Sequence, residues 1–228
     1  MVAQRNKLGG VDEAEEAFDY DPYSFDLGAF MAALPVGRDE KSVKQRCKLF
    51  RKWDVNNNKT LSFSEIDTSM RLLISSLYKS SEALEKVLKT WNRCWKPIVM
   101  RAYQDAKASN AELKSSGRDD YVEVDEFRLL LVCLRRYFEL HEAFRELDTS
   151  NDGRVDLSEF VEALPYLGRY WGIHVAPADA ELEFREIDAN GGGFVLFDEF
   201  TRWALRHSLT MDDGEDTGLL TAPIFEGE

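Results

Sequence analysis

A short pattern occurs four times in this chain, each time with the same internal spacing. It consists of an apolar residue, any residue, a second apolar residue, any residue, a glutamate and a bulky apolar residue. Its copies span residues 61–66, 122–127, 155–160 and 195–200. A supersecondary unit that recurs in this way decides the fold before any single helix or strand is considered. We therefore expect four copies of one structural unit, which we call hands one to four in chain order.

Three of the four copies carry an aspartate seven residues before their first apolar position. These aspartates and the pattern glutamates bound twelve-residue loops at 54–65, 148–159 and 188–199, and the corresponding second segment is 115–126. Twelve is the length of an EF-hand loop, in which positions 1, 3, 5, 9 and 12 direct side-chain oxygens at Ca²⁺ and position 7 offers its carbonyl. The apolar residue at position 8 pairs each loop with a neighbouring loop. The spacing therefore predicts paired calcium-binding hands.

Apolar residues at helical spacing precede the loops, as expected for a helix that enters each hand. They are Phe50 and Trp53, Leu140, Phe144 and Leu147, and Phe184 and Ile187. The pattern predicts an all-α fold of four EF-hand helix-loop-helix units in two paired lobes that pack compactly. Neither glycine nor proline occurs between 118 and 152, which favours a nearly continuous helix between hands two and three. The 61 residues between the starts of the first two loops predict lengthened helices within the first pair.

The expected domain organisation follows from this repeat. Residues 27–136 form an N-terminal EF-hand pair with loops 54–65 and 115–126, and residues 137–210 form a C-terminal pair with loops 148–159 and 188–199. Residues 1–26 and 211–228 are acidic, contain glycine and show no clear periodicity, so we interpret them as tails.

The third loop has the most complete set of oxygen ligands. Serine stands at position 3 but still offers an oxygen, and four acidic residues are available. The predicted calcium ligands are Asp148, Ser150, Asp152, Arg154 through its carbonyl, Asp156 and Glu159.

The first loop keeps its oxygens but places Lys59 at position 6, where glycine usually permits a left-handed turn. A side chain there costs about 1 kcal/mol or somewhat more, and its charge opposes a cation. A weak calcium site and a purely structural loop both remain open. The candidate ligands are Asp54, Asn56, Asn58, Thr60 and Glu65.

The fourth loop has the glycine at position 6 but lacks side-chain oxygens at positions 5 and 9, where Gly192 and Leu196 stand. Binding at reduced affinity and no binding are equally open. Its candidate ligands are Asp188, Asn190, Phe194 through its carbonyl, and Glu199. The second loop lacks the first aspartate and is expected to bind no ion and to pack against the first.

Composition excludes several classes of function. The chain carries 29 basic and 42 acidic residues, a net charge of −13, which opposes nucleic-acid binding through phosphates. Its longest apolar run, 129–134, is far shorter than the ~18 residues of a membrane span. No secretory signal is visible, and Val2 stands where an acylated glycine would. We expect a cytoplasmic protein whose cysteines, Cys47, Cys94 and Cys133, are reduced and packed in the core.

Several segments resemble the calflagins, the flagellar calcium-binding proteins of trypanosomatids. They are residues 33–35, 44–46 and 49–50 before the first loop, 101–107, and 121–129 around the end of the second loop. The resemblance implies a four-EF-hand calcium sensor in the flagellum whose two C-terminal loops carry the ion. It also implies calcium-dependent association with the flagellar membrane. The family's anchor, an acylated N-terminal glycine with a nearby cysteine, has no counterpart in this sequence.

Three functions are compatible with these features. A calcium sensor would expose apolar surface to a protein target, whose identity the sequence does not give. A calcium buffer would bind without opening, and a scaffold would use its EF-hand pairs for interaction with little metal binding. The ligands do not distinguish Ca²⁺ from Mg²⁺ as the resting occupant. No catalytic motif is present, and the three scattered histidines, His141, His174 and His207, are interpreted as exposed or capping residues, so we expect no enzyme.

Overall fold

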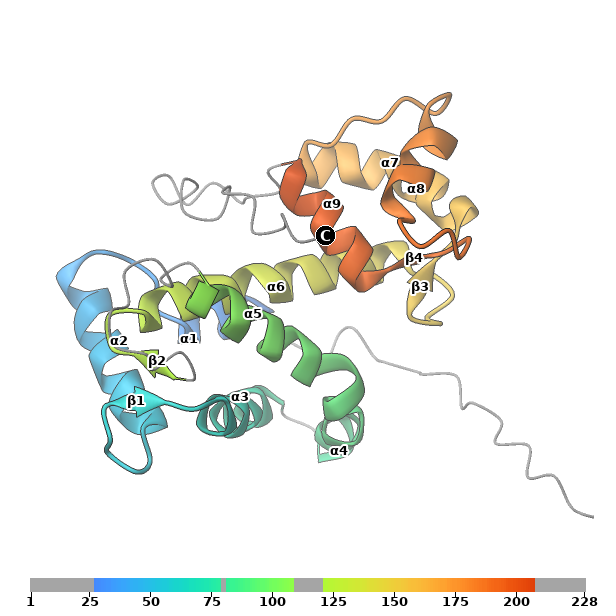
Figure 1. Cartoon of the computed structure of the whole chain (residues 1–228). Helices are drawn as coiled ribbons and strands as arrows, with labels where there is room; N and C mark the ends of the chain where they lie inside the picture. The colour runs from blue at the N-terminus through green and yellow to red at the C-terminus, as the bar shows by residue number, and fades with distance from the viewer. Residues whose placement is uncertain (1–26, 79–80, 109–120, 208–228) are drawn as a thin grey trace, which may run out of the picture.

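The computed structural model describes residues 27–78, 81–108 and 121–207, which form two lobes joined by one long helix (Figure 1). The first lobe contains α1 (Leu27–Ala33), α2 (Glu40–Trp53), β1 (Thr60–Leu61), α3 (Phe63–Leu77), α4 (Ser81–Thr90), the π-helical turn η2 (Trp91–Trp95), α5 (Lys96–Ala108) and β2 (Val122–Glu123). The joining helix is α6 (Phe127–Leu147). The second lobe contains β3 (Arg154–Val155), α7 (Leu157–Trp171), α8 (Ala180–Ile187), β4 (Val195–Leu196) and α9 (Phe197–Arg206).

The all-α EF-hand fold predicted from the repeat is confirmed. In each hand a two-residue strand lies between two helices of the described residues. The predicted tails at 1–26 and 211–228 lie outside the described residues, as does the part of the second loop before Tyr121. None of the described helices is long and apolar enough to cross a membrane.

The strands pair the hands within each lobe. β1 runs antiparallel to β2 with Leu61 opposite Val122, and β3 runs antiparallel to β4 with Val155 opposite Val195. All four side chains stand at loop position 8 and are almost completely buried. The apolar residue of the repeat therefore joins hand one to hand two and hand three to hand four, as its position predicts.

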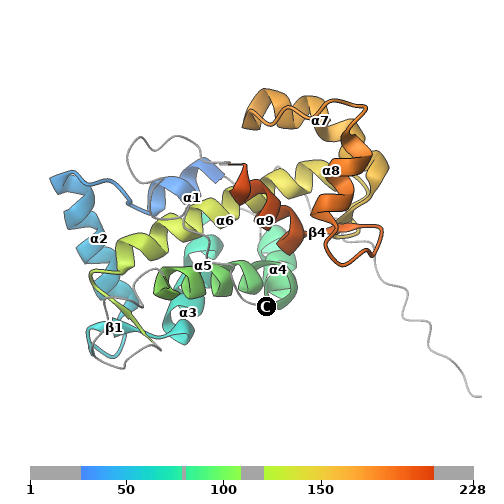
Figure 2. The ribbon, with the colours of Figure 1, turned by 45° about the horizontal axis from the view of Figure 1, so that its top comes forward.

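Helix α6 runs through both lobes, as Figure 2 shows. Its 21 residues leave hand two at Phe127 and enter hand three at Leu147, which confirms the expected continuous helix. The buried core of the first lobe extends to Phe138, and that of the second lobe begins at Leu140. Phe197, at the start of α9, packs against both cores. The two lobes therefore contact each other beside α6.

The long interval between the first two hands differs from the sequence prediction. Instead of lengthened helices, it contains an additional helix, α4, followed by η2. Trp91 and Trp95 in η2 are each 1% exposed, and Trp91 Nε1 donates to Asp67 Oδ1 at 2.8 Å. Pro97 follows in the first turn of α5, and its ring and missing N–H disturb the preceding helical hydrogen bonds. The extra length of this interval is therefore an inserted helix and a π-helical turn, not longer helices of the first two hands.

Candidate metal centre

Hands one, three and four hold the aspartate at loop position 1 in the same backbone cradle. The N–H of position 5 donates to Oδ1, and the N–H of position 6 donates to Oδ2. The first set of bonds joins Asn58 to Asp54 at 3.1 Å, Asp152 to Asp148 at 3.1 Å and Gly192 to Asp188 at 3.0 Å. The second joins Lys59 to Asp54 at 2.9 Å, Gly153 to Asp148 at 2.8 Å and Gly193 to Asp188 at 2.8 Å. Three loops with different sequences thus share one conformation.

The shared turn requires positive backbone φ at positions 4 and 6. Position 6 has φ of 84° at Gly153 and 81° at Gly193, and Lys59 takes 66° at the same place. An L-amino acid pays for this left-handed conformation, whereas glycine does not. The strain expected from Lys59 is therefore present, but it does not change the path of the loop.

The glutamate at position 12 closes the loop in all four hands. Its Oε2 accepts a hydrogen bond from the backbone N–H of position 9. These bonds join Ser62 to Glu65 at 2.9 Å, Glu123 to Glu126 at 2.8 Å, Asp156 to Glu159 at 2.9 Å and Leu196 to Glu199 at 3.0 Å. Because the glutamate lies in the first turn of the exiting helix in hands one, three and four, and directly before it in hand two, it ties that helix to its loop.

The second carboxylate oxygen of this glutamate differs between hands. Glu159 Oε1 accepts from the N–H of Ser150 at 2.8 Å, and Glu199 Oε1 accepts from the N–H of Asn190 at 3.1 Å. In hand one, Glu65 Oε1 is buried and has no hydrogen-bond partner among the described residues. A buried carboxylate oxygen without a partner is costly unless a cation approaches it. The free carboxylate oxygen of Glu65 therefore fits a hard cation in hand one.

Hand three concentrates negative charge in partly buried surroundings. Asp148 and Glu159 are 6% and 7% exposed. Burial raises the pKa of Asp148, and the neighbouring charges of Glu159 and Asp152 raise it further, against the opposing hydrogen bonds from Gly153 and Asp152. A cation at this loop would offset the same repulsion.

The remaining ligands predicted in hand three make other contacts. Asp152 Oδ2 accepts from Arg154 Nε at 2.8 Å, and Asp156 caps α7 by accepting from the Glu159 N–H at 2.9 Å. Hydrogen bonds from Ser158 and Glu159 hold the pKa of Asp156 below its usual range. Within the described residues, no three His, Cys, Asp or Glu side chains form a cluster that could hold a metal. An EF-hand instead combines two or three carboxylates with hydroxyl, amide and carbonyl oxygens. The donors of hand three fit that mixed set.

In hand four, a neighbouring side chain takes the space left by the missing side chain at position 5, which the sequence did not reveal. Asn190 Oδ1 lies 2.6 Å from the point that a Cβ of residue 192 would occupy. The amide oxygen thus fills the space of the absent position-5 side chain, and Gly192 is what allows it to do so. Leu196, at position 9, is 45% exposed and offers no oxygen from its side chain.

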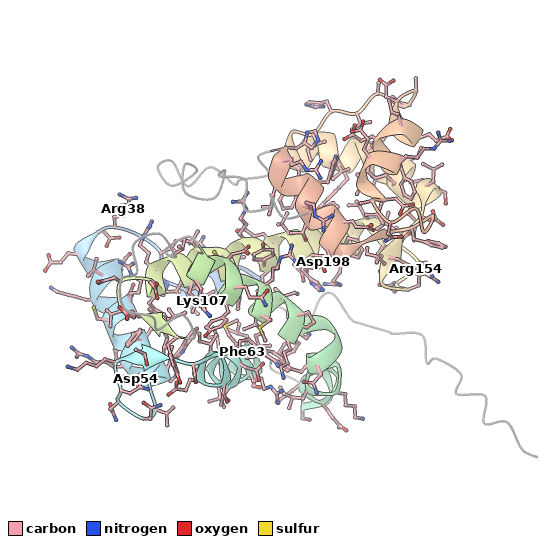
Figure 3. The ribbon with its side chains drawn as sticks, viewed as in Figure 1. Arg38, Asp54, Phe63, Lys107, Arg154 and Asp198 are labelled. Atoms are coloured by element: carbon pink, nitrogen blue, oxygen red, sulfur yellow. The ribbon has the colours of Figure 1, made fainter. Side chains whose placement is uncertain are left out.

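The first hand holds its predicted residues much as hand three does. Asn58 Oδ1 accepts hydrogen bonds from the N–H and Oγ1 of Thr60, both at 2.9 Å, as Asp152 Oδ1 accepts from the N–H of Arg154 at 3.1 Å. The side chains at positions 3 and 5 are exposed in both hands. Asp54 is 6% exposed and stands at the opposite end of the molecule from Arg154 of hand three, as Figure 3 shows. For hand two, the described part of the loop contains the closing Glu126, 2% exposed, and position 1, Ser115, lies outside the described residues.

Two family models match most of the chain. Residues 30–134 match the FCaBP EF-hand domain, and residues 137–205 match the EF-hand domain pair. The chain is 35% identical to the flagellar calcium-binding protein TB-24 of Trypanosoma brucei brucei over 189 residues, which cover 82% of this chain and 80% of that protein. It is 33% identical to the flagellar calcium-binding protein of Trypanosoma cruzi over 184 residues, 81% of this chain and 80% of that protein. A solved homolog of programmed cell death 6 protein from Leishmania major Friedlin shares 20% identity at a TM-score of 0.35, covering 78% of this chain and 80% of that one.

Proposed function

Because this chain belongs to the family of EF-hand flagellar calcium-binding proteins, we propose that it is a calcium sensor whose ion sites are hands three and four. One observation carries the assignment. Asp148 and Asp188 sit in matching backbone cradles, and in both hands the buried closing glutamate also accepts from the position-3 N–H through Oε1, whereas Glu65 Oε1 of hand one has no partner among the described residues. Both hands therefore present oxygen donors on a conformation that needs no rearrangement of the backbone at positions 5 and 6.

The closing glutamates connect the loops to the core of the second lobe. Glu159 directly precedes Phe160 on α7, and Glu199 directly precedes Phe200 on α9, and both rings are 1% exposed. A bound Ca²⁺ supplies the positive charge that draws these carboxylates toward the loop centre. A shift of Glu159 or Glu199 moves the first turn of its helix, because each is bonded to position 9. The apolar side chains carried by α7 and α9 then become accessible to a target.

The first experiment counts bound calcium. Titration calorimetry of the full chain is expected to show two ions per chain, and Asp148→Ala and Asp188→Ala are each expected to remove one. Asp54→Ala serves as the matched variant in hand one and is expected to leave both strong sites intact. If hand three binds no calcium at millimolar calcium concentration, the proposal is overturned.

A second experiment separates a sensor from a buffer. Trp203 is 4% exposed and lies beside Phe160 and Phe200 in the core of the second lobe. In a sensor, calcium changes the emission of Trp203 and increases the binding of a dye that reports apolar surface. A double variant, Glu159→Gln with Glu199→Gln, keeps the shape of both side chains and is expected to lose the response. Calcium binding without either change would identify a buffer.

The names of the relatives support a location in the flagellum, which we propose for this chain as well. We also propose that its target is a protein. A fluorescent fusion of the full chain expressed in a trypanosomatid cell is expected to concentrate in the flagellum. An even distribution through the cell body would refute this part of the proposal, and it would leave calcium binding untouched.

A further inference from the structure

The start of α9 extends from hand four toward the other lobe. Phe197 and Asp198 occupy loop positions 10 and 11, immediately before the closing Glu199. The Phe197 ring lies 5.5 Å from the ring of His141 and 5.6 Å from that of Phe144. Asp198 Oδ1 lies 3.5 Å from Nη1 of Arg101 on α5, and Figure 3 places Asp198 where the lobes meet. Both residues that precede the ligand therefore contact elements outside hand four.

The contacts continue into the core of the first lobe. His141 packs against Trp95 at 5.5 Å between ring centroids as well as against Phe197. Trp95 packs in turn on Phe138 at 5.3 Å. Arg101 is only 22% exposed, and its neighbours on the first-lobe side include Asp105. A largely buried row of aromatic rings thus connects the first lobe to the residues beside Glu199, together with an ion pair in which Arg101 is 22% and Asp198 67% exposed.

Hand three lacks a comparable support. Its residues at positions 10 and 11 are Leu157, which is 37% exposed, and Ser158, which is also exposed. In hand one, Phe63 at position 10 packs on Tyr103 within its own lobe. Of the three hands whose loops are fully described, hand four is the one whose residues at positions 10 and 11 contact the opposite lobe.

We infer that Arg101 and His141 are positioning residues for hand four, acting on Glu199 through Asp198 and Phe197. The inference rests on the proposed calcium site in that hand. Loop four has glycine at positions 4, 5 and 6, which makes its conformation expensive to order. External packing that fixes the first turn of α9 reduces this cost before the ion arrives. The N-terminal lobe therefore supports calcium binding at hand four without providing a ligand.

Replacement of Arg101 by glutamine tests the inference by the sign of its effect. Arg101 is a cation close to a predicted cation site, so Coulomb repulsion alone predicts that Arg101→Gln strengthens calcium binding at hand four. Loss of the Asp198 contact predicts the opposite, because Glu199 becomes less well positioned. The two explanations cannot give the same result.

The glycines at position 6 provide a separate probe for each hand. The amide of Gly153 donates to Asp148, and the amide of Gly193 donates to Asp188. Two-dimensional NMR of the ¹⁵N-labelled full chain, titrated with CaCl₂, reports the midpoint of each hand in the same sample. Arg101→Gln is expected to raise the calcium concentration at the Gly193 midpoint roughly two- to fivefold, the range of a partly exposed ion pair. Phe197→Leu is expected to raise it about fivefold or more. The Gly153 midpoint is expected to stay unchanged in both.

Matched controls and a calcium-free readout accompany these variants. Lys44→Gln breaks an exposed ion pair with Glu40 on α2, and Leu157→Ala alters position 10 of hand three, so neither is expected to move the Gly193 midpoint. Arg101→Lys keeps the charge and is expected to restore most of the affinity. In EDTA, the Leu196 amide, which donates to Glu199, is expected to exchange with solvent several-fold faster in Phe197→Leu than in the wild type.

Two failures are distinguishable. If the wild-type Gly193 signal does not respond to calcium, the proposed site in hand four is wrong. If it responds normally and Arg101→Gln leaves or tightens its midpoint, the positioning role is wrong while the site stands. If the variants raise the calcium midpoint of the Gly153 signal as much as that of Gly193, the inference is also overturned, because the second lobe is then damaged as a whole.

Discussion

Lys59→Gly tests whether hand one stores backbone strain. Lys59 has φ of 66°, close to the glycines at the same position in hands three and four. Its side chain is exposed, and its N–H donates to Asp54 Oδ2 at 2.9 Å, a bond that glycine would keep. The substitution therefore removes a strained Cβ and a surface charge without removing a core contact.

The expected magnitude follows from two opposing terms. A non-glycine residue in the left-handed region costs roughly 1–2 kcal/mol, which the substitution relieves. Glycine also increases the conformational entropy of the unfolded chain, which reduces this gain in stability by roughly 0.4–1 kcal/mol. Lys59→Gly is therefore expected to raise the free energy of unfolding by about 0.5–1 kcal/mol, or about 1–4 °C in Tm for a chain of this size.

The assay is urea unfolding of the calcium-free protein, followed by tryptophan emission. Gly153→Ala provides the reciprocal control in hand three, where φ is 84° and an added Cβ would meet no atom within 4 Å. That variant is expected to lose about 0.5–1 kcal/mol of unfolding free energy, because the added backbone strain exceeds the entropy that alanine removes from the unfolded chain. If Gly153→Ala behaves in this way and Lys59→Gly gives no stabilisation, Lys59 is not strained and the reasoning about hand one is wrong.

Three further predictions concern buried polar and thiol groups. Burial raises the pKa of Cys133 to about 12, whereas Cys47 is exposed, so a thiol reagent at pH 8 is expected to modify Cys47 and spare Cys133 until unfolding, as mass spectrometry would show. Burial also raises the pKa of Asp105, so the folded state holds this proton more tightly than the unfolded chain does. Its contribution to stability is greatest below an unfolded pKa of about 3.9 and is lost as the pH rises through the folded pKa. Asp105→Asn is therefore expected to gain stability relative to the wild type between pH 4 and pH 7 in urea unfolding, and a constant difference would contradict the assignment. Trp91→Phe removes the hydrogen bond to Asp67 and is expected to cost roughly 1.5–3 kcal/mol of unfolding free energy, with a loss below about 0.5 kcal/mol excluding a structural role for that bond.

Much of the fold was predictable because the EF-hand repeat uses each residue locally. The position-8 residues form the strand pairs, and the position-12 glutamates accept from position 9 in all four hands. Every one of these contacts is either within twelve residues or between equivalent positions of paired loops. A pattern of that length therefore contains the geometry of the loops, although it does not establish which of them binds an ion.

Features that depend on interruptions or on exposure were not predictable in the same way. The length of the first interval predicted lengthened helices, but it did not show that a π-helical turn carries Trp91 and Trp95. Cys47 was expected in the core because it lies within a helical pattern, yet it is exposed on α2. Periodicity identifies residues that share a face, and an individual residue near the edge of that face can be buried or exposed according to its neighbours.

The repeat does not predict the contacts between the lobes. Phe63 and Phe197 occupy the same position of their loops, yet Phe63 packs within its own lobe and Phe197 packs against both cores. The contact of Phe197 with the first lobe runs through His141 on α6, which packs beside both Trp95 and Phe197, although the sequence analysis interpreted His141 as an exposed or capping residue. Continuity of α6 could be predicted from the absence of glycine and proline, but the face it turns toward α9 depends on the packing of α5 and α9 together. The same repeat position therefore performs a local structural role in hand one and joins the lobes in hand four.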